Sequence, residues 1–276
     1  MSQSSDSTRK NRPRSDSNSE SNTWAFVLPF VVMMVVIMFY PKFDPTIDAE
    51  AFPDLVPMAE DGTETETIDY VPDADKTRTF MLLLGAQIAI AAGFFFYFRK
   101  TYLSQFPLRA SWLSVVFGIA GAVIWIGLCE LQVESTVMQW LGISEKSVAR
   151  PAFNPFAMIA DDPTRAMFFA VRFGVLVIVV PFVEELFLRG WLVRWWENPD
   201  FYQVRLAAVS MTGVLVATAY GVLAHPAEAI AAIAWFSFIS WLMLKTGNLW
   251  DCVIAHAVTN LLLGLYVLYF EAWRLW

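Results

Sequence analysis

The sequence predicts an all-α fold, a polytopic transmembrane helical bundle of about seven spans. Of the 276 residues, 57% are hydrophobic and only 16% are charged, whereas a soluble domain has about 45–50% apolar and about 25% charged residues. The apolar residues lie in long runs that do not alternate, which excludes barrel strands. Because a bilayer span needs roughly 20 mostly apolar residues and must satisfy its own backbone hydrogen bonds, these runs predict membrane-crossing helices.

The predicted spans divide the chain into four parts. A Ser/Asn/Arg-rich tail, residues 1–23, is expected to be disordered. Three N-terminal spans occupy residues 24–131, and a loop with an expected interfacial helix around Met138–Leu141 occupies 132–165. Residues 166–276 form a four-helix core. The seven runs cover residues 24–40, 79–98, 110–131, 166–191 with an extension towards Trp196, 206–223, 227–244 and 249–270.

The distribution of charge predicts how the chain sits in the inner (plasma) membrane. The net charge of −7 gives no support to nucleic-acid binding. The loop 41–78 holds eleven acidic against three basic residues, which gives −8 for this segment alone. With the N-terminus cytoplasmic, the inner segments contain more Lys and Arg, as the positive-inside rule requires. We therefore expect a multi-pass protein that contacts membrane lipid and exposes the acidic loop outside.

A few ionisable residues lie inside the apolar runs, and such residues mark functional sites because their burial is costly. The chain has two histidines, His225 and His256, and both lie in or beside predicted spans. Glu185 and Arg189 share one helix face at a spacing that favours an ion pair. His256 and Asn260 also share a face. Glu184 points about 100° away from Glu185 and has no partner on its own helix, which suits a base that takes a proton from water.

Each of these features also has a structural explanation. Glu185 and Arg189 are compatible with a structural ion pair, and His256 and Asn260 with a hydrogen-bonded contact between helices. His225 precedes Pro226 and is compatible with an interfacial polar residue at a helix end. Cys129 and Cys252 have neither metal-ligand spacing nor a disulfide framework, so we expect both to be packing residues. The polar residues as a group favour a functional site, since otherwise both histidines would be accidental.

Glu184-Glu185-x-x-x-Arg189, followed by His225 and then by His256-x-x-x-Asn260, resembles the CPBP family of intramembrane proteases. This family includes the type II CAAX prenyl endopeptidases and bacterial Abi proteins, and the resemblance covers roughly residues 166–265. The resemblance implies that Glu184 activates the attacking water with Glu185 and Arg189 as its companions. It implies that His225 belongs to the second motif, and that His256 and Asn260 stabilise the oxyanion. Such a division provides a base for water and donors for the developing charge.

The chain departs from the family pattern at one position and leaves the metal question open. The family usually has Phe four residues before the second-motif histidine, whereas this chain has Gly221 there and Tyr220 one residue earlier. Glu184, His225 and His256 are candidate Zn²⁺ ligands that would leave an open position. A mechanism without metal is the alternative, since no His-Glu-x-x-His spacing is present.

The sequence therefore predicts an intramembrane endopeptidase that hydrolyses a peptide bond of a membrane-associated protein or peptide. A non-catalytic membrane partner or immunity protein of the same family is an alternative, and a proton-coupled transporter is another. A transporter predicts internal repeats and broken spans, and the sequence has little of either. The chain also resembles the CAAX-protease-related proteins of exosortase-type sorting systems, which suggests a link to such a system.

Overall fold

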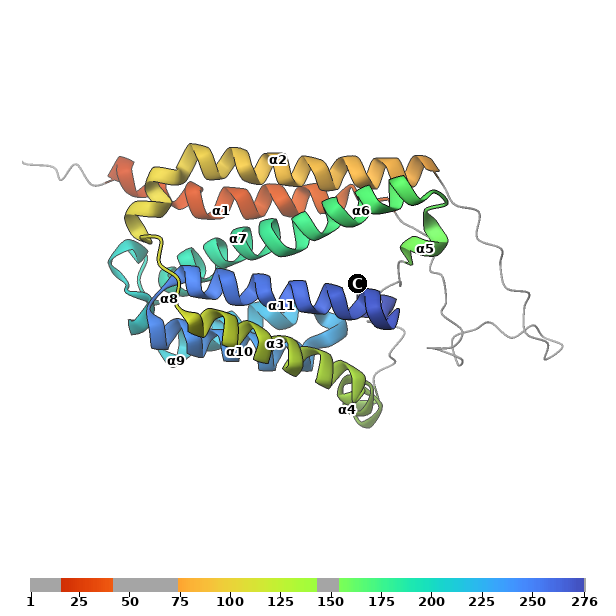
Figure 1. The fold of residues 1–276 in the computed structure, drawn as a ribbon. Coiled ribbons are helices and arrows are strands. Elements are labelled where there is room, and N and C mark those ends of the chain that lie inside the picture. The colour runs from red at the N-terminus through yellow and green to blue at the C-terminus, as the bar shows by residue number, and fades with distance from the viewer. Residues whose placement is uncertain (1–15, 42–73, 143–153, 276) are drawn as a thin grey trace, which may run out of the picture.

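The computed structural model describes residues 16–41, 74–142 and 154–275, and each regular element in these ranges is a helix. The long helices run roughly side by side (Figure 1). Five are long and apolar enough to cross a membrane: Ala74–Gln105, Trp112–Glu130, Asp162–Glu197, Pro226–Thr246 and Leu249–Phe270. Two shorter apolar helices, Thr23–Met38 and Met211–Ala224, correspond to the other two predicted runs. The predicted helical membrane bundle is confirmed.

The boundaries of the spans agree with the prediction within about four residues except at three helices. Helix α2 starts five residues before the predicted run 79–98 and ends seven residues after it, because polar residues continue the helix beyond the apolar run. Helix α1 starts at Asp16, inside the segment expected to be disordered, because a helix once nucleated propagates readily into neighbouring residues; residues 1–15 lie outside the described part. Helix α9 starts at Met211 instead of residue 206, because Ser210 is extended and its hydroxyl caps the helix. The helices are α1 Asp16–Met38, α2 Ala74–Gln105, α3 Trp112–Glu130, α9 Met211–Ala224, α10 Ala229–Thr246 and α11 Leu249–Phe270.

Short helices connect the third and fourth spans. Helix α4 (Val133–Leu141) buries Met138 and exposes Trp140, so it has the amphipathic character expected of an interfacial helix. The carboxylate of Glu134 accepts a 2.8 Å hydrogen bond from the backbone N–H of Ile230, which joins α4 to the start of α10. Helix α5 covers Pro155–Met158. The rest of this loop, residues 143–153, and most of the acidic loop, residues 42–73, lie outside the described residues.

The fourth span is one long helix with two π-helical segments. Asp161 caps its start, and the hydrogen bond from the backbone N–H of Thr164 lowers the pKa of the Asp161 carboxyl. In the first π segment the N–H of Val180 bonds to the carbonyl of Val175, five residues earlier. The consecutive parts are α6 Asp162–Gly174, η3 Val175–Val179, α7 Val180–Glu185, η4 Leu186–Leu192 and α8 Val193–Glu197.

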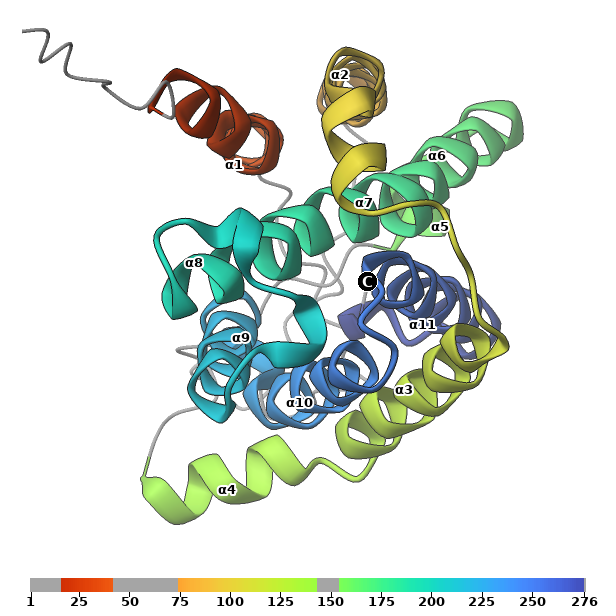
Figure 2. The ribbon, with the colours of Figure 1, turned by 90° about the vertical axis from the view of Figure 1, so that its left-hand side faces the viewer.

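The helices that carry the candidate site residues, such as Glu184 on α7 and His256 on α11, lie next to one another in the bundle. Viewed along the bundle, α7, α9, α10 and α11 surround a common centre, while α1 and α2 lie beyond α7 (Figure 2). Helix α3 packs closely on α11 because it presents glycines: a Cβ at Gly118 would lie 2.7 Å from the carbonyl oxygen of Ala255. Close approach through small residues is typical of helix pairs in membranes.

Candidate functional site

A buried ion pair joins two turns of the long helix. The Arg189 guanidinium forms a salt bridge and hydrogen bond with Glu185 Oε2, as their spacing predicts, and both residues have no exposed surface. Arg189 also donates to the backbone carbonyl of Phe236 on α10, with an N–O distance of 3.5 Å. A buried carboxylate needs a cationic partner and further hydrogen bonds to remain ionised. These contacts keep Glu185 in a fixed position and attach the helix to α10.

His256 on α11 lies between the two adjacent glutamates. Its Nδ1 is 3.0 Å from Glu185 Oε1, and its Nε2 is 3.7 Å from Glu184 Oε2. The first distance is a hydrogen bond, whereas the second is too long for a direct one. When Nδ1–H donates to Glu185, the other ring nitrogen is left facing Glu184. The histidine is 5% exposed, so this arrangement is shielded from bulk solvent.

Glu184 finds its partners on other helices, as expected from its lack of one on its own. The hydroxyl of Tyr220 on α9 donates a 2.7 Å hydrogen bond to Glu184 Oε1. The Oε2 atom faces His256 on α11. Glu184 is 8% exposed. The carboxylate is therefore held between α9 and α11 without an ion pair to Arg189 among the contacts of the described residues.

A chain of hydrogen bonds behind His256 fixes its position against two further helices. The Trp235 ring on α10 packs edge-on against the His256 ring, with 4.7 Å between the ring centroids. Trp235 Nε1 donates to the Thr259 hydroxyl over 3.2 Å, and that hydroxyl donates to the carbonyl of Gly118 over 2.9 Å. Because the indole, the hydroxyl and the carbonyl are all partnered, the imidazole has a rigid support.

His225 lies in a different setting from the other predicted site residues. Its Nδ1 lies 3.1 Å from the carbonyl of Gly221, and its ring packs against Trp125 and Phe236 with centroid distances of 5.3 and 5.7 Å. Within the part of the chain that the structure describes, the carboxylates that pair with a histidine contact His256 instead. The residue of α9 that reaches Glu184 is Tyr220, five residues before His225.

The presence of glycine at position 221, where the family usually has Phe, has a structural reason. A Cβ at this position would lie 2.2 Å from Cδ2 of Phe236, so the α10 ring fills the space that a side chain at 221 would need. The same ring lies 5.9 Å from the Tyr220 ring and 5.7 Å from the His225 ring, measured between centroids. The ring of Phe236 from α10 therefore occupies the space beside residue 221.

Asn260 lies one turn beyond His256 on α11 and contacts the first π segment. Its amide nitrogen donates a 2.9 Å hydrogen bond to the carbonyl of Leu176. In the π register that carbonyl would pair with the N–H of residue 181, five positions later, but Pro181 has none. Asn260 therefore supplies the missing donor. An asparagine amide has a second hydrogen, which this contact leaves available.

The three candidate zinc ligands do not form a donor set in this structure. Glu184 and His256 are neighbours, but the described contacts of His225 are rings and a backbone carbonyl. Over residues 16–41, 74–142 and 154–275, no group of three or more His, Cys, Asp or Glu side chains is arranged to hold a metal ion. These residues therefore do not fit a zinc site, and no step of the chemistry below uses one.

Sequence reasoning missed Tyr220, Trp235 and Thr259. Their contacts depend on how separate helices are rotated about their axes, and the apolar runs contain no periodic signal for that rotation. The aromatic residue next to Gly221 was the one available hint, since it stands one position from the expected ring. Asp251, five residues before His256, contributes to packing elsewhere, because its carboxylate accepts a 2.7 Å hydrogen bond from the Ser111 N–H at the start of α3.

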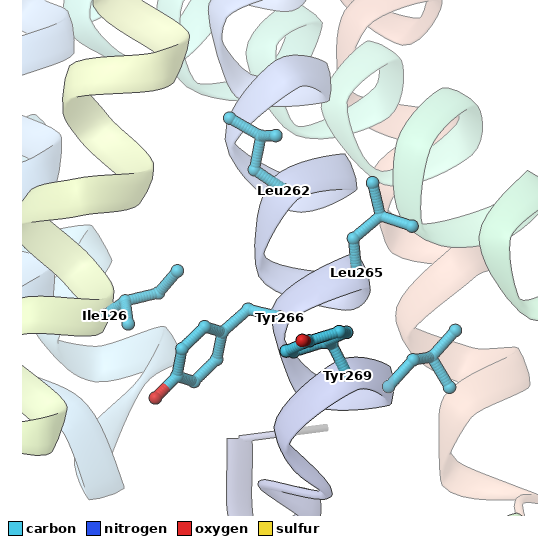
Figure 3. A pocket seen from close by; sticks show the side chains of 6 residues that line it. Ile126, Leu262, Leu265, Tyr266 and Tyr269 are labelled. Atoms are coloured by element: carbon cyan, nitrogen blue, oxygen red, sulfur yellow. The ribbon is translucent and has the colours of Figure 1, made fainter.

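An apolar groove of about 650 Å³ lies elsewhere on α11 (Figure 3). Leu265 lies nine residues after His256, which at about 100° per residue places it about half a turn around the helix. The groove is therefore separate from the carboxylates. Its lining consists of Ile126 from α3 and of Leu262, Leu265, Tyr266, Leu268 and Tyr269 from α11.

Residues 166–262 match the family model described as type II CAAX prenyl endopeptidase Rce1-like. The match spans the helices that bear Glu184, Tyr220 and His256 and confirms the predicted relationship to the CAAX/CPBP protease family for this part of the chain. It thereby supports a membrane endopeptidase of the CAAX type in general. No curated protein and no solved structure matches the chain.

Proposed function

We propose that this chain is an intramembrane endopeptidase that cleaves a membrane-associated protein. The proposal starts from the match of residues 166–262 to the Rce1-like family model. One observation carries the proposal: two adjacent buried glutamates take different partners around a single histidine. Glu185 is paired with Arg189, whereas Glu184 is held by a phenol and faces the imidazole. Two like carboxylates in different environments are typical of groups with different catalytic roles.

In the proposed reaction Glu184 is the general base. Glu184 Oε2 and His256 Nε2 lie 3.7 Å apart, too far for a direct hydrogen bond, and the proposed attacking water bonds to both atoms. Glu184 takes a proton from the water as its oxygen bonds to the carbonyl carbon of the scissile peptide. The same proton then passes to the amine nitrogen as the carbon–nitrogen bond breaks. The products are a carboxylic acid and an amine, and Glu184 is returned to its starting state.

The residues around the base would stabilise the charge that develops on the peptide oxygen. Arg189 and Glu185 keep His256 in a fixed orientation. With a proton on each ring nitrogen, His256 donates to Glu185 through Nδ1–H and can donate to the peptide oxygen through Nε2–H. A donor fixed in advance stabilises a transition state without reorganisation. The family resemblance assigns oxyanion stabilisation to His256 and Asn260, and Asn260 has one amide hydrogen beyond the one donated to Leu176. The resemblance also implies a catalytic role for His225, which directly follows the last residue of α9.

We also propose that the catalytic groups lie within the cytoplasmic half to the middle of the inner membrane. His256 is seven residues from the start of α11, or about 10 Å along the helix, and Tyr220 is nine from the start of α9, or about 14 Å. The ends of the bundle nearest to these starts bear Arg99, Lys100, Arg109, Arg205 and Lys245. Such a bias supports a cytoplasmic orientation of this end and a cytoplasmic N-terminus.

A proteolysis assay tests the proposal. The full chain is reconstituted in liposomes with a panel of single-span membrane proteins, including some with exosortase-type sorting tails, and new termini are identified by mass spectrometry. We expect the wild type to cut at least one panel member and Glu184→Gln to lose about 10²–10⁴-fold in rate. Glu130→Gln is the matched control, because Glu130 pairs with Arg274 away from the site.

The same assay separates the alternatives. A wild type that binds a panel member without cutting it would favour the non-catalytic partner, and proton uptake into the liposomes without cleavage would favour a transporter. Equal cleavage by the wild type and Glu184→Gln would contradict the assignment of the base.

A further inference from the structure

We propose that Tyr220 is a positioning residue that reserves one oxygen of Glu184 for the reaction. Its hydroxyl donates to Glu184 Oε1 over 2.7 Å, so Oε2 is the oxygen that remains on the side of His256. Because it concerns the same carboxylate, this inference rests on the proposed function. The resemblance to the protease family assigns no role to an aromatic hydroxyl at this position.

The Tyr220 ring is held by three other rings, so its hydroxyl has a defined direction. Its centroid is 6.0 Å from that of Phe30 on α1, 5.9 Å from that of Phe187 and 5.9 Å from that of Phe236 on α10. Aromatic pairs at these separations attract each other beyond their burial. A tyrosine in such a setting has an apolar body and one polar tip that needs a partner. Glu184 Oε1 is that partner.

Fixing one oxygen matters because the terminal torsion of a glutamate is soft. Rotation about the bond to the carboxyl group has broad minima, so a carboxylate without a partner samples many directions. The titratable groups that contact Glu184 are His256 from α11 and Tyr220 from α9, whereas Glu185 and Arg189 on its own helix pair with each other. Of these, Tyr220 is the one that donates to Glu184 at hydrogen-bond distance. Loss of its hydroxyl would free the carboxylate to turn.

Tyr220 keeps its proton throughout the proposed cycle. The water gives its proton to Oε2 of Glu184, and the phenol continues to donate to Oε1. No group other than water and the peptide is consumed. Tyr220 therefore affects the reaction through the orientation of Glu184, and its removal should lower the rate of the chemical step more than it weakens substrate binding.

The kinetic test compares Tyr220→Phe with Tyr102→Phe in the reconstituted full chain. Tyr102 is a matched control because its buried hydroxyl also donates a short hydrogen bond, but to the carbonyl of Ala25, 2.6 Å away, and not to a glutamate. For a panel substrate that the wild type cleaves, we expect kcat of Tyr220→Phe to fall about 10- to 100-fold with KM nearly unchanged. Tyr102→Phe should keep the wild-type kcat. An unchanged kcat in Tyr220→Phe would overturn the proposal.

A spectroscopic test does not depend on cleavage. 3-Fluorotyrosine is placed at 220 or, as the control, at 102, and the ¹⁹F resonance is compared with and without Glu184→Gln. We expect the resonance at 220 to shift and the one at 102 to stay in place. A resonance at 220 that ignores Glu184→Gln would overturn the proposal. A shift at 220 in a chain that cleaves no substrate would refute the hydrolase while supporting the assignment of Tyr220 to Glu184 Oε1.

Discussion

The surroundings of His256 and of His225 differ in nearly every chemical respect. Around His256, both ring nitrogens face carboxylates, and one carboxylate is fixed by an arginine. Around His225, the ring lies between Trp125 and Phe236, and its Nδ1 approaches the backbone carbonyl of Gly221. The two residues are of the same type, but His256 lies within the apolar helix α11, whereas His225 directly follows the apolar helix α9.

The difference shows that the neighbours of a buried histidine, more than its presence, define a reaction centre. An imidazole between two carboxylates can hold or pass on a proton, because an acceptor stands at each nitrogen. An imidazole between aromatic rings is packed and partly solvated, and the described residues give it no acidic partner. The centre of the candidate site is therefore the Glu184–His256–Glu185 arrangement, and His225 lies at its margin.

The sharpest test of this comparison replaces each histidine in turn. We expect His256→Ala to lower the cleavage rate about 10²–10⁴-fold, because it removes the group that faces both glutamates. His225→Ala should lose clearly less, since it removes a ring packed against other rings. Initial cleavage rates in liposomes measure both. Equal losses would mean that His225 meets the reacting groups when substrate binds, and the comparison would fail.

The second test compares a buried ion pair with an exposed one. Arg189→Met should lower the free energy of unfolding by about 3–5 kcal/mol, because it leaves Glu185 buried without a cationic partner. Arg274→Met removes a pair whose side chains are 24% and 40% exposed, so we expect a change of about 0–1 kcal/mol. Denaturant unfolding in mixed micelles measures both. Similar losses would show that burial does not distinguish the two pairs.

The third test concerns the packing beside His225. Gly221→Ala should lower the free energy of unfolding by about 1–3 kcal/mol, because its Cβ would meet the Phe236 ring at 2.2 Å. Adding Phe236→Leu should recover part of that loss. Gly127→Ala on α3 is the control, since no heavy atom lies within 4 Å of its added Cβ. A double variant that loses the sum of the single losses would argue against direct contact at Gly221.

The fold was largely predictable from the sequence, because a bilayer fixes how long an apolar helix must be. The last span, Leu249–Phe270, was predicted to the residue, and the sixth was predicted within two residues at each end. The predicted start of α9 was wrong because the apolar run already includes Leu206, Ala207 and Ala208. The helix itself starts only after its local cap at Ser210. A cap is a local hydrogen bond, and an average over a window of residues does not detect it.

The candidate site was predictable only where its members share a helix. The Glu185–Arg189 pair follows from a spacing of four residues, and the structure confirms it. Contacts between helices, such as Tyr220 with Glu184, depend on how each helix is rotated about its axis and how far it is shifted along the bundle. The spacing of residues in a single sequence does not indicate either quantity. The expectation that His225 belongs with the other site residues came from its place beside an apolar span and from the family resemblance, and its catalytic role stays a prediction.

The two π-helical segments give the fourth span a property that a straight α-helix would lack. Each such segment accommodates an extra residue compared with an α-helix of the same number of turns. Deleting one residue within Val175–Val179 would restore the α register there and rotate everything N-terminal to it by about 100° relative to Glu184. Asn260 would then no longer face the Leu176 carbonyl to which it donates. A design that grafts the glutamate motif onto another scaffold must therefore include the two π-helical segments. On a regular α-helix the same side chains would point in different directions.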